Sequence, residues 1–170
     1  MEEPFFNGNL YCRVEIPKGS RNKYEWDPDL GEIVLNRFLF ASVVYPVDYG
    51  FFPGTLAEDG DPLDALVCVS EPTFPGCVIG VKAIALLKMS DEEGGDDKVL
   101  CVPCRDPNWM RLERLEDIPE QLRTEIEYFF AMYKRPEGKQ VEIEGWHSHD
   151  AAMQAIEEAH ERALAARPNS

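Results

Sequence analysis

Apolar and polar residues alternate through much of the first two thirds of the chain, a pattern typical of strands with one buried face. In residues 11–17, Cys12, Val14 and Ile16 are expected to face one side and the residues between them the other. The short spacing between the predicted strands, and the frequent Gly and Pro residues that separate them, favour a small closed or partly closed barrel. Further strands are predicted at residues 32–40, 63–70, 77–89 and 98–104, with the last two forming a long hairpin joined by residues 90–97.

The last third changes to a helical period, and two helices are predicted, at residues 116–134 and 148–166. Pro119 near the first turn and Asp117 as a cap would start the first helix. Ser148 or Asp150 would cap the second. The apolar face of the first helix comprises Leu122, Ile126, Phe129, Phe130 and Tyr133, and that of the second comprises Ala152, Ala155, Ile156, Ala159 and Ala163.

Composition and charge narrow the classes of partner. The 170 residues carry 32 acids against 17 bases, a net charge of −15, so we expect neither nucleic acid nor an anionic membrane as partner. If the substrate is an anion, local cations must attract it. The start "MEEPFFNGNLYC" lacks the pattern of a secretory signal, and the five cysteines suggest reduced thiols, so we expect a cytoplasmic protein.

The segment "EDGDPLDALV", residues 58–67, concentrates carboxylates in front of an apolar run. Asp59, Asp61 and Asp64 repel one another, and Gly60 and Pro62 would hold them in a stiff turn. Asp64 is predicted at or inside a buried strand, where a carboxylate is costly unless a cation or hydrogen bonds compensate it. The stretch therefore indicates a cation site more strongly than an ordinary solvated acidic turn.

A second acidic loop, "SDEEGGDDK", joins the two strands of the predicted hairpin. An acidic hairpin tip alone is usually only a solvated surface. Two acid-rich loops at strand ends could together bind hard divalent cations, which take oxygen ligands. The carboxylates of this loop are Asp91, Glu92, Glu93, Asp96 and Asp97.

Two other metal motifs fit poorly. An EF-hand fails because Leu63 and Asp64 stand at its fifth and sixth positions and Ser70 replaces its final Glu. Cys101 and Cys104 form a lone C-x-x-C in an apolar strand, so two buried thiols are expected rather than zinc. A surface pair is likewise expected for His147 and His149.

The aspartate motif "DGDPLDA" resembles the signature of the Mg²⁺-dependent, barrel-type family of soluble inorganic pyrophosphatases. Similar segments follow the family's order over residues 11–163: "VEIPKGSRNKYEWD", "NRFLF", "YPVDYGF", "LKMSDEEGGDDK", "FFAMYK" and "IEGW". The resemblance implies a mainly β fold with α: a five-stranded OB-like closed β-barrel with two packed helices in the C-terminal third, forming one domain over residues 1–170. The length resembles the short bacterial type, which implies a homohexamer.

The resemblance also implies an activity and a site. The enzyme would hydrolyse pyrophosphate to two orthophosphates by direct attack of a water activated by several Mg²⁺, with Mn²⁺ or Zn²⁺ as possible substitutes. Asp61 would accept or orient the water's proton, with Asp96 as the rival base. The implied metal ligands are Glu15, Glu25, Asp59, Asp64, Asp91 and Asp96, and the implied phosphate contacts are Lys23, Arg37, Tyr49, Lys98, Tyr133 and Lys134.

Two other functional classes fit the sequence less well. A cation-binding module could use the same acids without chemistry, but it would not need the ordered Lys, Arg and Tyr residues. A nucleotide phosphohydrolase would need a base pocket and a Gly-rich phosphate loop, and the sequence indicates neither. The sequence therefore favours the diphosphatase.

Overall fold

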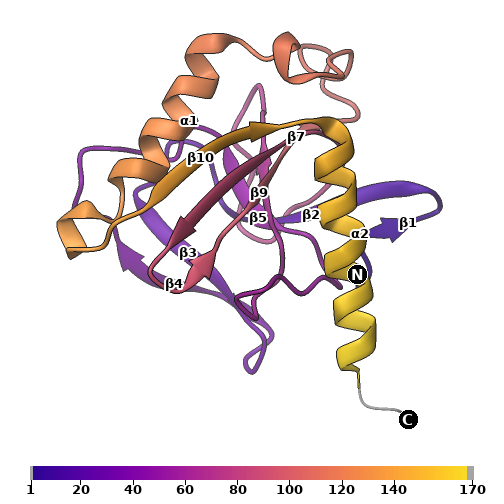
Figure 1. Cartoon of the computed structure of the whole chain (residues 1–170), viewed down its shortest axis with the longest axis horizontal. Coiled ribbons are helices and arrows are strands. Elements are labelled where there is room, and N and C mark those ends of the chain that lie inside the picture. The colour runs from indigo at the N-terminus through magenta and orange to yellow at the C-terminus, as the bar shows by residue number, and fades with distance from the viewer. Residues whose placement is uncertain (1, 168–170) are drawn as a thin grey trace.

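Five strands close into a ring through their hydrogen bonds in the computed structural model, which describes residues 2–167 (Figure 1). All neighbours in the ring run antiparallel except one parallel pair, β6 with β9. This arrangement confirms the predicted mainly β fold with two C-terminal helices. The ring runs in the order β2 (Asn9–Ile16), β5 (Asp48–Phe51), β6 (Asp64–Val67), β9 (Lys98–Pro103) and β7 (Val78–Asp91), and β7 pairs again with β2.

The membership of the ring differs from the strands that the pattern predicts. The predicted strand at 32–40 is β4 (Glu32–Phe38), which pairs only with β3 (Asn22–Asp27) in a separate two-stranded sheet. Its place in the ring is taken by β5, whose four residues "DYGF" show no clear alternation. Gly50 is required there, because a Cβ would lie 1.9 Å from the Arg13 carbonyl oxygen of the neighbouring strand.

Three further strands extend the sheet. β1 (Phe5–Phe6) pairs with β2, and β8 (Gly94–Gly95) folds back on the end of β7 within the acidic connection. β10 (Glu142–His147) pairs with the other edge of β7 and was not predicted as a strand. The predicted long hairpin of β7 and β9 is confirmed.

Helix α1 (Glu120–Met132) buries Ile126, Phe129 and Phe130 against the sheet, as its period predicts. Its predicted start is wrong. Pro119 occupies the N-cap position, and the Asp117 carboxylate instead accepts hydrogen bonds from the N–H groups of Glu113 and Arg114 around the short 3₁₀ turn Leu115–Asp117. A second 3₁₀ turn, Arg135–Glu137, follows α1.

Helix α2 (His149–Ala166) packs along β7 with Ala152, Ile156 and Ala159 buried (Figure 1). Ser148 is its N-cap and accepts a hydrogen bond from the Ala151 N–H, so Ser148 rather than Asp150 is the cap. Among the described residues, none of the helices combines the length and the apolar character needed to cross a membrane.

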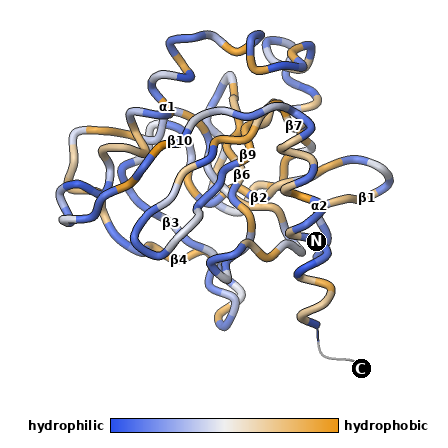
Figure 2. Tube along the Cα trace, in the orientation of Figure 1, coloured by the Kyte–Doolittle hydropathy of each residue, from blue (hydrophilic) through white to orange (hydrophobic). Residues whose placement is uncertain are grey.

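The strands separate two hydrophobic clusters, and the most apolar stretches of the chain lie at the centre of the molecule (Figure 2). Alternate residues of β6 show the division. Leu66 belongs to the cluster that contains Phe129 of α1, whereas Ala65 and Val67 belong to the cluster that contains Ile156 of α2. Because both faces of β6 are covered, the residue at its start, Asp64, is held by packed backbone.

Candidate active site

A cavity of about 620 Å³ lies where β2, the β3–β4 hairpin, the two acidic loops and the end of α1 meet. All of the predicted site residues except Arg37 and Lys98 line it. The lining set is Glu15, Lys23, Glu25, Tyr49, Asp59, Asp61, Asp64, Asp91, Asp96, Tyr133 and Lys134. The fold therefore brings together residues that lie far apart in the sequence.

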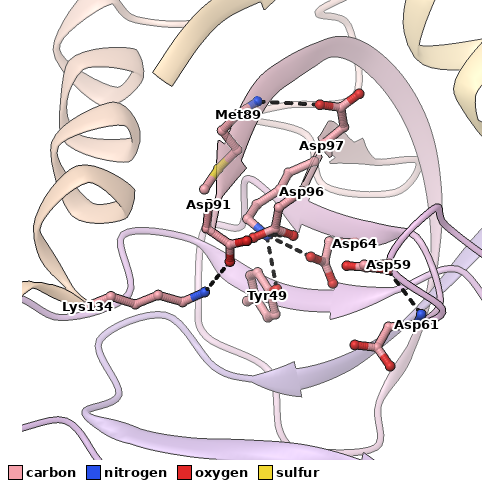
Figure 3. A network of polar contacts seen from close by, with 10 residues as sticks. Tyr49, Asp59, Asp61, Asp64, Met89, Asp91, Asp96, Asp97 and Lys134 are labelled. Atoms are coloured by element: carbon pink, nitrogen blue, oxygen red, sulfur yellow. Dashed lines mark hydrogen bonds and ion pairs between the residues drawn. The ribbon is translucent and has the colours of Figure 1, made fainter. Parts of the chain in front are cut away.

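The first acidic loop is shaped by its own hydrogen bonds. The Asp59 carboxylate accepts a bond of 3.0 Å from the Asp61 N–H, and Gly60 between them has a φ of 93°, which favours glycine. Asp64 begins β6, as predicted. The side chains of Asp59, Asp61 and Asp64 lie close together on one side of the site (Figure 3).

Only some of the carboxylates of the second acidic loop face the cavity. Asp91, Glu93 and Asp96 line the cavity, whereas Asp97 points away and accepts a bond of 3.4 Å from the Met89 N–H (Figure 3). The Lys134 ammonium lies 3.1 Å from the Asp91 carboxylate. Burial opposes ionisation of Asp91, but bonds from the Glu93 N–H and from Lys134 outweigh it and lower the pKa of this carboxyl.

Lys98 lies behind the carboxylates, with only 1% of its side chain exposed. Its ammonium is 2.7 Å from Asp64, 3.0 Å from Asp96 and 3.3 Å from the Tyr49 hydroxyl. Burial would lower the pKa of Lys98, but the two carboxylates outweigh it and raise the pKa, so the lysine stays charged. Lys98 thus joins the two acidic loops from behind the cavity.

Glu15 and Asp61 form no ion pair within the part of the chain that the structure describes. Burial raises the pKa of Glu15 to about 7, although its carboxylate accepts a 2.8 Å hydrogen bond from the Trp26 N–H; Asp64 and Glu25 add to the rise. Burial also raises the pKa of Asp61, with further contributions from Asp59 and other acids. Uncompensated negative charge of this kind fits divalent cations with oxygen ligands.

The acids surround the cavity rather than meeting at one point. Among residues 2–167, no three His, Cys, Asp or Glu side chains converge as a ready-made metal site would. Lys98 and Lys134 instead pair with three of the carboxylates. The donor chemistry fits a hard cation, and binding would require these ion pairs to adjust.

The predicted cationic and phenolic residues occupy different depths. Burial lowers the pKa of Lys23, which lines the cavity from β3. Arg37 faces Lys23 across the hairpin but forms a two-pronged ion pair with Glu137, at 2.7 and 3.1 Å, outside the cavity lining. Tyr133 stacks on Phe129, with ring centroids 5.1 Å apart, and still reaches the cavity wall.

The lining residues that the predicted site omits include Arg13 and Trp26. The Arg13 guanidinium lies over the Trp26 ring, 4.9 Å from its centroid. The alternation of β2 provides the missed signal, because it places Arg13 on the same side as Glu15.

The cysteine and histidine pairs that were considered as metal motifs lie outside the cavity lining. Cys101 is buried, but Cys104 is exposed, which corrects the expectation of two buried thiols; the strand ends at Pro103, just before it. His147 and His149 are both exposed, as predicted, and lie beside Glu144 and Asp150 respectively.

Comparison with known proteins adds independent information. The family model described as inorganic pyrophosphatase matches residues 12–164. An inorganic pyrophosphatase of Methanosarcina acetivorans is 58% identical over 151 residues, covering 89% of this chain and 90% of the relative. One from Streptomyces coelicolor is 53% identical over 150 residues, covering 88% of this chain and 92% of the relative.

Solved structures agree with the sequence comparison. The crystal structure of inorganic pyrophosphatase from Thermus thermophilus superposes with a TM-score of 0.88 at 44% identity, covering 91% of each chain. The inorganic pyrophosphatase of Helicobacter pylori gives a TM-score of 0.91 at 32% identity, covering 96% of this chain and 98% of that one.

Proposed function

The chain belongs to the inorganic pyrophosphatase family, and on this premise we propose that it is an Mg²⁺-dependent diphosphatase that hydrolyses pyrophosphate to two orthophosphates. The observation that carries the proposal is the cavity in which five aspartates face lysine and tyrosine side chains. Such a site can hold cations and a small polyanion together, which is the requirement for phosphoryl transfer to water.

The cations would be several Mg²⁺, with Mn²⁺ or Zn²⁺ as substitutes. When bound, Mg²⁺ neutralises phosphate charge and lowers the pKa of a water towards neutrality. The proposed ligands are Asp59, Asp64 and Asp96, with Asp91, Glu15 and Glu25 holding further ions directly or through water. The raised pKa values of Glu15 and Asp96, in which burial is the largest cause, support this assignment, since a cation would relieve the cost of ionising them.

The chain's own proton acceptor is proposed to be Asp61, which would orient the attacking water and accept its proton. Its backbone N–H is fixed on Asp59, and its carboxylate belongs to the same acidic group as Asp64 (Figure 3). Asp96 is less suited as base in this arrangement, because its carboxylate is engaged by Lys98 at 3.0 Å. The proposed attack is direct, without a covalent intermediate.

Substrate charge would be balanced by fixed donors. Lys23, Lys134, Tyr49 and Tyr133 line the cavity, and their ammonium and hydroxyl groups are proposed to contact phosphate oxygens. Arg37 would need to exchange its Glu137 partner for phosphate. Lys98 is proposed to act from beneath, by holding Asp64 and Asp96 in place and adding positive potential.

Assembly and location are further parts of the proposal. We propose a homohexamer of single-domain protomers, supported by large apolar side chains exposed on and after the β3–β4 hairpin: Leu30, Leu35, Phe38, Phe40 and Val44. A cytoplasmic location is supported by the five free cysteines, three of them buried thiols. Light scattering on the purified protein tests the assembly.

The activity is tested by phosphate release from pyrophosphate, ATP and a phosphate monoester, each with Mg²⁺ and with EDTA. The proposal expects rapid release from pyrophosphate that requires Mg²⁺, with much slower release from the others. Absence of release from folded, Mg²⁺-loaded protein would instead support a cation-binding module.

A further inference from the structure

Arg13 places a cation in the cavity wall. Within residues 2–167 its side chain makes no hydrogen bond or ion pair, and its Nε atom is buried without a partner. We propose that Arg13, held by Trp26, forms a phosphoryl-binding subsite at the edge of the cavity, separate from the carboxylates. The inference deepens the proposed function and rests on it for the identity of the anion.

The register of the ring explains why Arg13 is left unpaired. Arg13 pairs with Phe51, Phe51 with Asp64, and Asp64 with Lys98. Directly paired residues project from the same face of a sheet, and strands are about 4.8 Å apart. The backbones at Arg13 and Asp64 are therefore about 10 Å apart, with the apolar Phe51 between them, while Lys98 takes the position next to Asp64.

Trp26 fixes Arg13 in place. Its indole ring lies under the guanidinium, while its backbone N–H holds the Glu15 carboxylate at 2.8 Å. A guanidinium that lies over an aromatic face keeps the N–H groups of its two terminal nitrogens free, and a pair of them matches two oxygens of a phosphoryl group. Arg13 is thus prepared to bind a tetrahedral oxyanion without first breaking an ion pair.

The volume of the cavity and the negative charge of the chain both support such a subsite. The cavity of about 620 Å³ lies in the range of 300–1,000 Å³ typical of sites for drug-sized ligands, so it has space for a phosphoryl group at Arg13 beside the carboxylates and the cations proposed to bind them. With a net charge of −15, the chain repels anions overall. A phosphoryl group bound at Arg13 would be either one end of incoming pyrophosphate or an orthophosphate that is leaving.

Equilibrium dialysis of the metal-free protein with labelled orthophosphate, and separately with methylenediphosphonate, tests the subsite without requiring hydrolysis. Arg13→Met should weaken binding of the anion by about 10-fold or more, the loss expected for a charged hydrogen-bond pair. Arg13→Lys should weaken it less, and Trp26→Leu should weaken it although the backbone bond to Glu15 remains. A loss seen with both ligands indicates a shared subsite, whereas a loss confined to one identifies whether substrate or product uses it.

Arg21→Met is the matched control, because Arg21 also stacks on an aromatic ring, Phe38 at 4.6 Å, but does not line the cavity. Thermal unfolding identifies folded variants, and Arg13→Gln replaces Arg13→Met should the latter fail to fold. In turnover, Arg13→Met should lower kcat/KM about 10-fold with little change in kcat.

Wild-type affinity for both anions in folded Arg13→Met would overturn the subsite, as would the absence of metal-free anion binding by the wild type. Loss of hydrolysis in the wild type with Arg13-dependent binding intact would overturn only the proposed function.

Discussion

The Lys98 ammonium lies 2.7 Å from the Asp64 carboxylate, and the lysine is almost completely buried. The two residues face each other across the parallel pair β6–β9, so the ring itself places them together. Because the same ammonium also reaches Asp96 at 3.0 Å, it joins the two acidic loops. A single buried cation thereby sets the spacing of two proposed metal ligands.

Lys98→Met tests this role. Removing the ammonium leaves two partly buried carboxylates unpaired, and breaking a buried ion pair typically costs about 3–5 kcal/mol in the free energy of unfolding. Denaturant unfolding of the metal-free variant should show a loss of this order, and Mg²⁺ should recover part of it. Lys18→Met, at an exposed lysine, is the control, and equal stabilities for the two variants would contradict the role.

The pKa of Glu15, raised by burial from its ordinary 4.5 to about 7, predicts a pH-dependent stability in the absence of metal. The folded state binds the proton of the Glu15 carboxyl more tightly than the unfolded state does. The stability gained from this protonation is therefore complete below pH 4.5 and is lost as the pH rises through 7. The difference between the two pKa values corresponds to a contribution of about 3 kcal/mol to the free energy of unfolding.

Glu15→Gln should therefore be more stable than the metal-free wild type at pH 8, with the difference disappearing near pH 4. Chemical denaturation with EDTA at both pH values measures it. Glu32→Gln, at an exposed position of β4, should show no such dependence. A stability difference that is the same at both pH values would argue against an uncompensated Glu15.

Tyr133→Phe separates substrate contact from packing. The ring stays in the aromatic cluster with Phe129 and Phe130, so folding should be preserved, while this cavity-lining residue loses its hydroxyl. KM for pyrophosphate should rise several-fold, consistent with one lost hydrogen bond of about 1 kcal/mol, with Mg²⁺ affinity nearly unchanged. Tyr128→Phe, on the exposed face of α1, is the control.

Lys134→Ala should have a larger effect on substrate than on metal. Loss of the charge should raise KM about 10- to 100-fold, the range for hydrogen bonds to charged groups. Releasing Asp91 from its 3.1 Å ion pair should leave Mg²⁺ binding unchanged or stronger. Calorimetric titration measures the Mg²⁺ affinity. A loss of Mg²⁺ affinity larger than the rise in KM would argue against Lys134 as a phosphate contact.

The strands with strong alternation or continuous burial, such as β2, β6, β7 and β9, could be predicted from the sequence. β5 could not, because its four residues include a buried Asp48 and a glycine required by a neighbouring backbone. The start of α1 was missed because Asp117 can cap either a helix or a 3₁₀ turn, and only the tertiary fold selects the turn.

The acidic part of the site was predictable because the sequence places its members in two short loops. The burial of Lys98 could not be predicted, since a lysine is almost never buried unless partners from other strands compensate its charge. The ion pair between Arg37 and Glu137 joins residues 100 positions apart, which no local pattern indicates. The pairing of Arg13 with Trp26 likewise depends on contact between β2 and β3.

The most direct test of the account is the rate of phosphate release from pyrophosphate as the Mg²⁺ concentration increases, measured for the wild type and for Asp61→Asn side by side. The account predicts that the wild-type rate rises from near zero in EDTA to a plateau. Asp61→Asn should fold and bind Mg²⁺ but release phosphate about 10²- to 10⁴-fold more slowly, the usual contribution of a positioned base. A wild-type rate in Asp61→Asn would contradict its proposed role, and release that persists in EDTA would contradict the cation-dependent site.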